Sequence, residues 1–338
     1  MDILKDIAIN HNNPELGIVN VTNNEDKEMR SYAMLQSNAI NCVRGNAAQA
    51  IAELLWNERT LFKQLKDTIE RLVFDETLWP AYNIERKWAS EIILNQYDKD
   101  YRLAGFYDTK NMLFLLYPKY REQVLKTIKK CYESEDKDLI DMGANCLSEM
   151  FIRNNEFFEI INNVDAMSEA QAKAILHMAT NYFNKGEFNS IVKDLIRKFK
   201  ASALDLGMPI SRLFYDDLID LKRDKDFMIE IMNSGLNRRI VHAFVHYLEE
   251  KSKSFVDYKD IIFSMSYHLL GNEVGKFEEI WGIENEMSKL IIGLYDETSN
   301  STIPEIKDIA NECLDIWDLM FEKEFGQIRS LSQKLMER

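Results

Sequence analysis

The feature of this sequence that most constrains its fold is a pair of amphipathic segments within residues 38–75, separated by a short break at Asn57-Glu58. In each segment apolar residues recur at steps of three and four, which places them on one face of an α-helix. Two such helices joined by a few residues form an antiparallel hairpin, and a lone hairpin leaves an apolar face uncovered. The pattern therefore predicts further hairpins stacked on this one. The apolar positions are Ile40, Val43, Ala47, Ala50, Ile51, Leu54 and Leu55, then Leu61, Phe62, Leu65, Ile69, Leu72 and Val73.

Helical periodicity continues along the rest of the 338-residue chain, which has only 12 glycines and 5 prolines. Both counts are low for a soluble protein, and no alternating strand pattern competes with the helical one. The predicted fold class is therefore all-α. We expect an α-solenoid of antiparallel helical hairpins, HEAT-like or armadillo-like, wound as a right-handed superhelix, with helix pairs recurring roughly every 30–45 residues.

Turn-forming residues mark the domain boundary that the sequence predicts. Asn12-Asn13-Pro14 and Gly17 indicate an irregular N-terminal lead-in over residues 1–24. Residues 25–338 contain no Gly/Ser-rich or Pro-rich linker, which predicts a single continuous solenoid.

Several helix boundaries carry local signals. Ser168 with Gln171, and Thr302 with Glu305, fit the capping box that begins a helix. Pro118 is expected to end a helix that covers 98–117. Pro80 suits the first turn of a helix that continues through Trp88, followed by helices near 119–133, 137–153, 155–163, 169–184, 187–200, 204–221, 224–234, 238–251, 255–270, 277–298, 303–321 and 324–337.

Charge and cysteine usage limit the classes of partner and compartment. Lys and Arg number 42 against 56 Asp and Glu, a formal net charge of −14 that disfavours nucleic acid as a partner. The four cysteines are widely spaced among apolar neighbours, which predicts buried free thiols in a reducing compartment. The N-terminal residues contain no basic leader with an apolar run, and no stretch has the length of a membrane span. We expect a cytoplasmic protein without membrane association.

Two short segments carry a family resemblance. The stretch from Asn41 to Ala48, reading NCVRGNAA, is followed by Leu54-Leu55-Trp56, and the far end reads LIIGLY from Leu290 and CLDIWD from Cys313. These segments resemble the beginning and the end of the C-terminal helical-repeat region of bacterial STAND-type NTPases, many of them linked to phage defence. The resemblance covers about residues 38–338 and implies a HEAT-like sensor region separate from its NTPase motor.

Candidate chemistry in the chain is sparse, and we expect no enzymatic activity and no cofactor. The stretch Gly271–Phe277 is one residue shorter than a phosphate-binding loop, ends in Phe, and follows a helix instead of a strand. His242 and His246 lie four residues apart, with Glu249 and Glu250 following, a spacing that allows a zinc site. A pair of histidines at helical spacing is weak evidence for a metal, so ordinary packing histidines are the favoured interpretation, and His177 fits a hydrogen-bonded core residue better than a general base.

Basic residues that share one face of a helix allow a second interpretation of the function. In two predicted helices they form a ridge that could bind DNA phosphates, as in the HEAT-like DNA glycosylases, although acidic residues flank each of the two helices. The residues concerned are Lys126, Lys129 and Lys130 in one helix and Lys193, Arg197 and Lys200 in another.

Aromatic residues near the front of the chain are the main candidates for partner binding. Trp79, Tyr82 and Trp88 are predicted to share one helix with Arg86, and Trp, Tyr and Arg are enriched in protein-binding hot spots. The same aromatics could instead pack between hairpins. Arg44 beside Gly45 indicates either a working surface or a close helix crossing with the guanidinium at its edge.

The sequence thus predicts a recognition function. A protein partner would bind the concave surface of the solenoid through Arg44, Trp79, Tyr82 and Arg86, and the event would be passed to an NTPase module. The alternatives are a DNA-binding protein of the glycosylase type and a structural scaffold in an oligomeric complex.

Overall fold

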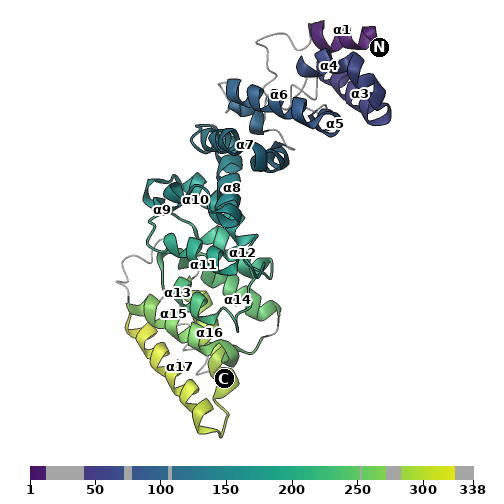
Figure 1. The fold of residues 1–338 in the computed structure, drawn as a ribbon. Coiled ribbons are helices and arrows are strands. Elements are labelled where there is room, and N and C mark those ends of the chain that lie inside the picture. The colour runs from purple at the N-terminus through teal and green to yellow at the C-terminus, as the bar shows by residue number, and fades with distance from the viewer. Residues whose placement is uncertain (13–41, 72–77, 106–108, 252, 272–282, 324–338) are drawn as a thin grey trace. The chain divides into compact units, whose positions relative to one another are not determined.

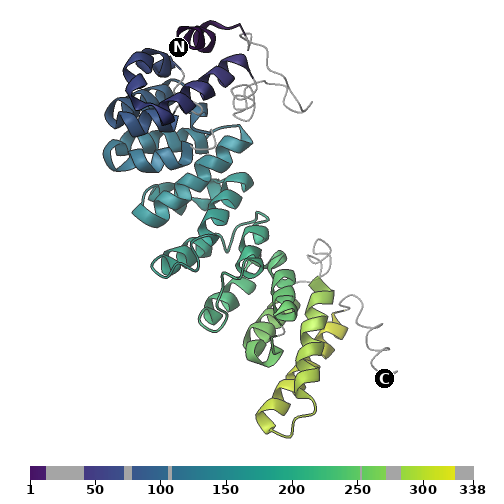
Figure 2. The ribbon, with the colours of Figure 1, turned by 90° about the vertical axis from the view of Figure 1, so that its right-hand side faces the viewer.

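The computed structural model describes residues 1–12, 42–71, 78–105, 109–251, 253–271 and 283–323. Every regular element in these ranges is a helix, which confirms the all-α fold class. The chain divides into two compact units, Met1–Leu147 and Ser148–Arg338, and the division falls within helix α8 (Lys137–Asn154). The helices of each unit can be followed in Figures 1 and 2. The continuous right-handed solenoid over residues 25–338 stays a prediction.

Unit 1 is built from short helices that pack in sequence order. Helix α1 contacts α3 and α4, α5 contacts α6, and α6 contacts α7. The bounds are α1 Asp2–Asn10, α3 Val43–Asn57, α4 Phe62–Arg71, α5 Leu78–Ile84, α6 Arg86–Lys99 and α7 Thr109–Tyr132, with short 3-10 turns at Arg59–Leu61 and Tyr101–Gly105.

Helix α1 corrects the expected irregular lead-in over residues 1–24. Its nine residues form a regular helix, and Ala8 on its inner face is fully buried. The turn signals at Asn12-Asn13-Pro14 lie after this helix, so they mark where it ends and say little about the residues before them. Residues 13–24 lie outside the described ranges.

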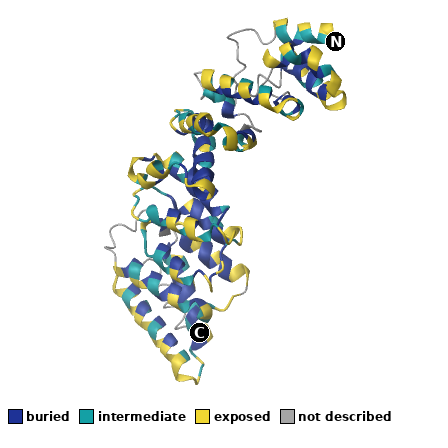
Figure 3. Cartoon of the chain, in the orientation of Figure 1, coloured by how far each residue is buried: buried dark blue, intermediate teal, exposed yellow. Residues whose placement is uncertain are grey.

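The paired amphipathic segments each bury an apolar face, as their spacing predicts. Ile51 and Leu55 of α3 and Leu65 and Ile69 of α4 are fully buried. Val43 and Leu54 are exceptions, because they are 39% and 36% exposed although the spacing places both on the apolar face. In Figure 3 most helices are dark blue along one side and yellow along the other, which is the amphipathic pattern that the sequence carries.

Two of the helices predicted from the sequence differ from the helices of the structure in where the helical backbone is interrupted. The helix expected to run through Pro80 and Trp88 is two helices, α5 and α6, separated at Glu85, whose backbone angles of φ −139° and ψ 76° are not helical. The helix expected over 98–117 begins later, since α6 ends at Lys99, a 3-10 turn covers Tyr101–Gly105 and α7 begins at Thr109. Pro118 does not end α7, whose interruption falls at Tyr120, with φ −125° and ψ 42°. Proline removes a backbone donor and crowds the preceding turn, so the helix kinks here instead of stopping.

Unit 2 consists of helices whose alternate members contact one another. Helices α10, α12, α14 and α16 form one such series, and α13, α15 and α17 form another. The bounds are α9 Phe158–Asn162, α10 Glu169–Thr180, α11 Asn189–Lys198, α12 Gly207–Tyr215, α13 Lys225–Met232, α14 Ile240–Glu250, α15 Lys259–Gly271, α16 Ile283–Thr298 and α17 Pro304–Glu322, with 3-10 turns at Val164–Ala166, Gly235–Arg238 and Phe255–Tyr258.

One of the two predicted capping boxes is present. The Ser168 hydroxyl accepts from Gln171 N, and the Gln171 side chain accepts from Ser168 N, which confirms the start of α10. The box predicted at Thr302 is wrong, because α17 begins one residue later with Ile303 as its N-cap and Pro304 in the first turn. Proline has no N–H to satisfy at that position, so the helix begins without a side-chain cap.

All four cysteines, Cys42, Cys131, Cys146 and Cys313, are buried free thiols, as expected. Burial raises the pKa of the Cys313 thiol to about 12 and that of Cys131 further still. Both thiols therefore stay protonated near neutral pH and behave as small apolar core groups. Among the helices that the structure describes, none combines the length and apolar character of a membrane span.

Candidate functional site

The structure brings together three of the four residues predicted to bind a partner. Trp79 and Tyr82 lie on α5, and their ring centroids are 6.4 Å apart in an edge-to-face arrangement. Arg86 begins α6, and its guanidinium lies 5.9 Å from the centroid of the Tyr82 ring. Both rings are half-buried and Arg86 is exposed. We call Trp79, Tyr82 and Arg86 the aromatic–cation cluster.

Trp88 has a different role from these three residues. Its ring packs edge-to-face against Phe62 of α4 with 5.2 Å between centroids, and the ammonium of Lys66 lies 5.1 Å from its centroid. Trp88 therefore joins α6 to α4, which is the packing role that the sequence left open for it.

Arg44 does not join the cluster. Its Nε donates a hydrogen bond of 3.3 Å to the backbone oxygen of Ala8, close to the C-terminal end of α1. Carbonyls at the end of a helix have no partner within the helix, and a cation there also interacts favourably with the helix dipole. Arg44 thus holds α1 against α3, the close helix contact that its position beside the buried Gly45 indicated.

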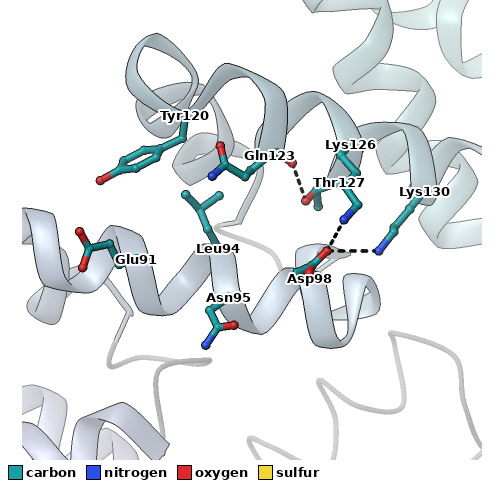
Figure 4. Close-up of a pocket in the computed structure, with 9 residues that line it drawn as sticks. All are labelled: Glu91, Leu94, Asn95, Asp98, Tyr120, Gln123, Lys126, Thr127 and Lys130. Atoms are coloured by element: carbon teal, nitrogen blue, oxygen red, sulfur yellow. Dashed lines mark hydrogen bonds and ion pairs between the residues drawn. The ribbon is translucent and has the colours of Figure 1, made fainter.

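A cleft with a volume of about 310 Å³ lies between α6 and α7. In Figure 4 Tyr120 and Gln123 extend from α7 toward α6, while Glu91 and Leu94 extend from α6 toward α7. The remaining lining residues are Asn95 and Asp98 on α6 and Lys126, Thr127 and Lys130 on α7.

One end of this cleft is closed by ion pairs. The Asp98 carboxylate accepts a hydrogen bond of 2.5 Å from Lys126 Nζ, and Lys130 Nζ lies 3.7 Å away (Figure 4). The hydrogen bond from Lys126, together with the charges of both lysines, lowers the pKa of Asp98. Asp98 is therefore ionised at neutral pH, and two cations facing one anion leave this end with a positive charge.

The histidine pair is not organised as a metal site. Nδ1 of His242 lies 3.3 Å from Glu286, whereas Nδ1 of His246 lies 3.6 Å from Glu250. Each imidazole faces its own carboxylate, and across the described ranges no group of three His, Cys, Asp or Glu side chains is arranged to hold a metal ion. The expected apolar setting of His177 is wrong, because this residue is exposed and its ring lies 3.0 Å from Arg212.

The basic residues considered as a DNA-binding ridge form ion pairs with carboxylates. Lys193 contacts Asp224 at 2.7 Å, and Arg197 and Lys200 contact Glu230 at 2.7 and 2.6 Å. Lys126, Lys129 and Lys130 of α7 contact Asp98 or Glu133. The charges of Lys129, Lys193, Arg197 and Lys200 are thus compensated by neighbouring helices or within their own helix, whereas Lys126 and Lys130 share the single carboxylate of Asp98.

The cleft was missed at the sequence level, although a signal for it exists. Glu91, Asn95 and Asp98 follow steps of four and three along α6, and Gln123, Thr127 and Lys130 do the same along α7. Two polar stripes on consecutive helices indicate that these faces border a solvent-filled groove where the helices meet.

The fold and site therefore define an all-α protein of packed short helices, with an aromatic–cation cluster on α5 and the start of α6 and a polar cleft between α6 and α7. Comparison of the chain with protein-family models, with curated proteins and with solved structures found no match.

Proposed function

We propose that this protein is a non-enzymatic recognition module, in which hairpins stacked as a right-handed HEAT-like solenoid present a concave surface to a protein partner. The series of contacts between alternate helices in unit 2 supports this arrangement, because stacked hairpins place every second helix side by side. The short resemblance to STAND-type sensor regions supports a role as the sensor or adaptor of a bacterial defence NTPase, working in the cytoplasm.

The observation that carries the proposal is that Arg86 lies beside aromatic rings and has no carboxylate partner in the described ranges. Within the described ranges its guanidinium makes no ion pair and lies beside the half-exposed Tyr82 and Trp79 rings. A cation without a carboxylate, set among half-exposed aromatics, keeps its donors available to a partner. Tyr, Trp and Arg are also the residues that carry most of the binding free energy in protein interfaces.

The test is photo-crosslinking from within the cluster. A photoreactive phenylalanine analogue at position 82 is expected to capture a defined protein from lysates of phage-infected cells and not from lysates of uninfected cells. The captured protein is then purified and its affinity for the unlabelled chain is measured. Trp79→Ala and Arg86→Glu should each weaken binding at least tenfold, since hot-spot truncations have effects of this size.

Matched controls separate the cluster from general surface effects. Trp56 is 52% exposed on α3, and Lys307 is exposed on α17, so Trp56→Ala and Lys307→Glu make the same chemical changes elsewhere. Both should leave affinity within twofold of the wild type. Equal effects of cluster and control variants, or no specific capture at all, would contradict the proposal.

Two other functions have tests of their own. Binding to DNA is disfavoured because the basic residues of the possible DNA-binding helix form ion pairs with carboxylates. Retention of duplex DNA by the protein in a low-salt gel shift would support this function against the recognition function.

A scaffold role is favoured by two exposed apolar residues on one face of α17. Leu314 and Phe321 lie seven residues apart and are 47% and 48% exposed. A stable dimer in light scattering that Leu314→Asp abolishes would support that role.

A further inference from the structure

We propose that the cleft between α6 and α7 binds an extended peptide segment that carries a basic side chain and a carboxylate about three residues apart. The inference rests on the proposed recognition function and names the chemistry of the partner segment. It depends on the charge at each end of the cleft, the distance between those ends, and the hydrogen-bonding groups between them.

Glu91 provides the negative end. Its side chain is exposed, forms no ion pair with any residue in the described ranges, and extends toward α7 in Figure 4. A carboxylate that no neighbour neutralises favours a ligand cation, and an Arg or Lys side chain can donate charge-assisted hydrogen bonds to it. The preferred group at this end is therefore a guanidinium or an ammonium.

Lys126 and Lys130 provide the positive end. Both contact the single carboxylate of Asp98, which leaves one positive charge uncompensated. Lys126 is 58% exposed in its side chain, so its remaining donors can reach a ligand carboxylate. The cleft is dipolar, and a ligand with a single kind of charge would be attracted to one end and repelled from the other.

The separation of the two ends sets the spacing of the ligand charges. Glu91 and Asp98 are seven residues apart on α6, which corresponds to about 10 Å along a helix with a rise of 1.5 Å per residue. A polyproline II segment advances about 3.1 Å per residue with three residues per turn, so residues i and i+3 point the same way about 9 Å apart. This spacing matches the cleft.

The middle of the cleft suits a peptide backbone. Asn95 and Gln123 offer amide groups that both donate and accept hydrogen bonds, and neither side chain is bonded to another described residue. Leu94, which is buried, adds an apolar group to the lining. A polyproline II backbone has no internal hydrogen bonds, so its carbonyl groups are free to accept hydrogen bonds from the NH₂ groups of these side chains, even where the residue is proline.

The experiment uses labelled, end-capped peptides and fluorescence anisotropy with the full chain at physiological salt. We expect a peptide containing Lys-Pro-Pro-Glu to bind at least tenfold tighter than one with adjacent Lys-Glu or one containing Glu-Pro-Pro-Glu. Absence of binding by Lys-Pro-Pro-Glu at concentrations up to about 1 mM would overturn the proposal, because the binding free energy would then be weaker than about −4 kcal/mol.

Charge reversal at one end provides the decisive variant. Glu91→Lys should reverse the preference, so that Glu-Pro-Pro-Glu binds at least tenfold tighter than Lys-Pro-Pro-Glu. Glu187→Lys changes the net charge equally at an exposed position in unit 2 and should leave the wild-type preference unchanged. An unchanged order of affinities in Glu91→Lys would overturn the assignment. If that variant does not fold by circular dichroism, Glu91→Gln should lose at least tenfold in affinity for Lys-Pro-Pro-Glu.

The outcomes distinguish this inference from the proposed function. One outcome is that Glu91→Lys changes peptide binding while Trp79→Ala and Arg86→Glu leave the affinity for the captured partner unchanged. This result would support the cleft as a binding site and contradict the role of the aromatic–cation cluster. Partner capture that depends on Trp79 and Arg86, without any peptide binding, would contradict the cleft alone.

Discussion

Charged side chains serve different purposes in unit 2 and on the α5–α6 surface of unit 1. In unit 2, Lys193 on α11 pairs with Asp224, and Arg197 pairs with Glu230 on α13, each at 2.7 Å. On α5–α6, Arg86 lies beside an aromatic ring and forms no ion pair in the described part of the chain. The same residue type therefore joins neighbouring helices in one region and stays available in the other.

This difference suggests how surface charges in a helical array can be interpreted. A cation opposite a carboxylate on the next helix contributes to stacking, and its solvent-facing donors are already used. A cation over a ring without a carboxylate contributes little to folding, because an exposed cation–π contact is weak. The comparison therefore predicts that stability and binding respond to different residues.

The largest expected effect concerns the close contact of Gly143 on α8 with the end of α7 in unit 1. A Cβ atom at Gly143 of α8 would lie 2.3 Å from the backbone nitrogen of Tyr132. Because backbone cannot move aside as a flexible side chain can, Gly143→Ala should cost about 3 kcal/mol of unfolding free energy, measured by chemical denaturation. Gly186 in unit 2 has no atom within 4 Å of such a Cβ, and Gly186→Ala should be neutral or slightly stabilising. Similar losses in both variants would contradict this account of the contact.

The next effect tests the buried ion pair of unit 2. The Asp224 side chain is fully buried and contacts Lys193 and Arg223, so Asp224→Asn leaves Lys193 without its anion. We expect a loss of about 2–3 kcal/mol at pH 7, measured by urea denaturation.

The same variant should change how stability depends on pH. Burial alone would raise the pKa of Asp224, but hydrogen bonds from Arg223 and Lys193 outweigh it, so the folded-state pKa is lowered. The carboxylate therefore stabilises the fold above its unfolded pKa of about 3.9, and this contribution is lost as pH falls through the lower folded-state pKa. The stability gap between wild type and Asp224→Asn should be constant from pH 7 to about 5 and shrink below about 4. A gap as large at pH 3 as at pH 7 would rule out this linkage.

A smaller and local effect is expected at Arg44. Arg44→Ala removes the donor to Ala8 O and should weaken the attachment of α1 by about 1 kcal/mol. Hydrogen exchange should accelerate at the amides of residues 2–10 and not in α4. Arg59→Ala, at an exposed position in the same unit, provides the control. If Arg59→Ala also accelerates exchange at residues 2–10, the effect of Arg44→Ala reflects a general loss of stability and not the lost hydrogen bond to Ala8.

The smallest effect should be at Arg86 itself. Arg86→Ala should change the unfolding free energy by less than about 0.5 kcal/mol, whereas Arg197→Ala in unit 2 should cost about 1 kcal/mol because it loses Glu230 and Asp194. Equal losses in the two variants, measured side by side, would remove the contrast between the regions.

Much of the fold could be predicted because helical periodicity is local. The spacing of Ile51, Leu55, Leu65 and Ile69 identified the buried faces of α3 and α4, and Ser168 with Gln171 identified the start of α10. The break at Glu85 was not predictable, since no Pro or Gly marks it. Trp79, Tyr82 and Arg86 were proposed as site residues on one continuous helix, yet two helices bring them together.

By itself the sequence determined the helical class, most buried faces and the burial of the four thiols, because these follow from the spacing of apolar residues within one helix. Only the tertiary structure decided which charges are compensated. Asp98 faces Lys126, and Asp224 faces Lys193 about 30 residues away, through contacts between helices that periodicity cannot specify. The same contacts left Arg86 and Glu91 without ion-pair partners in the described part of the chain, and they opened the cleft beside Glu91.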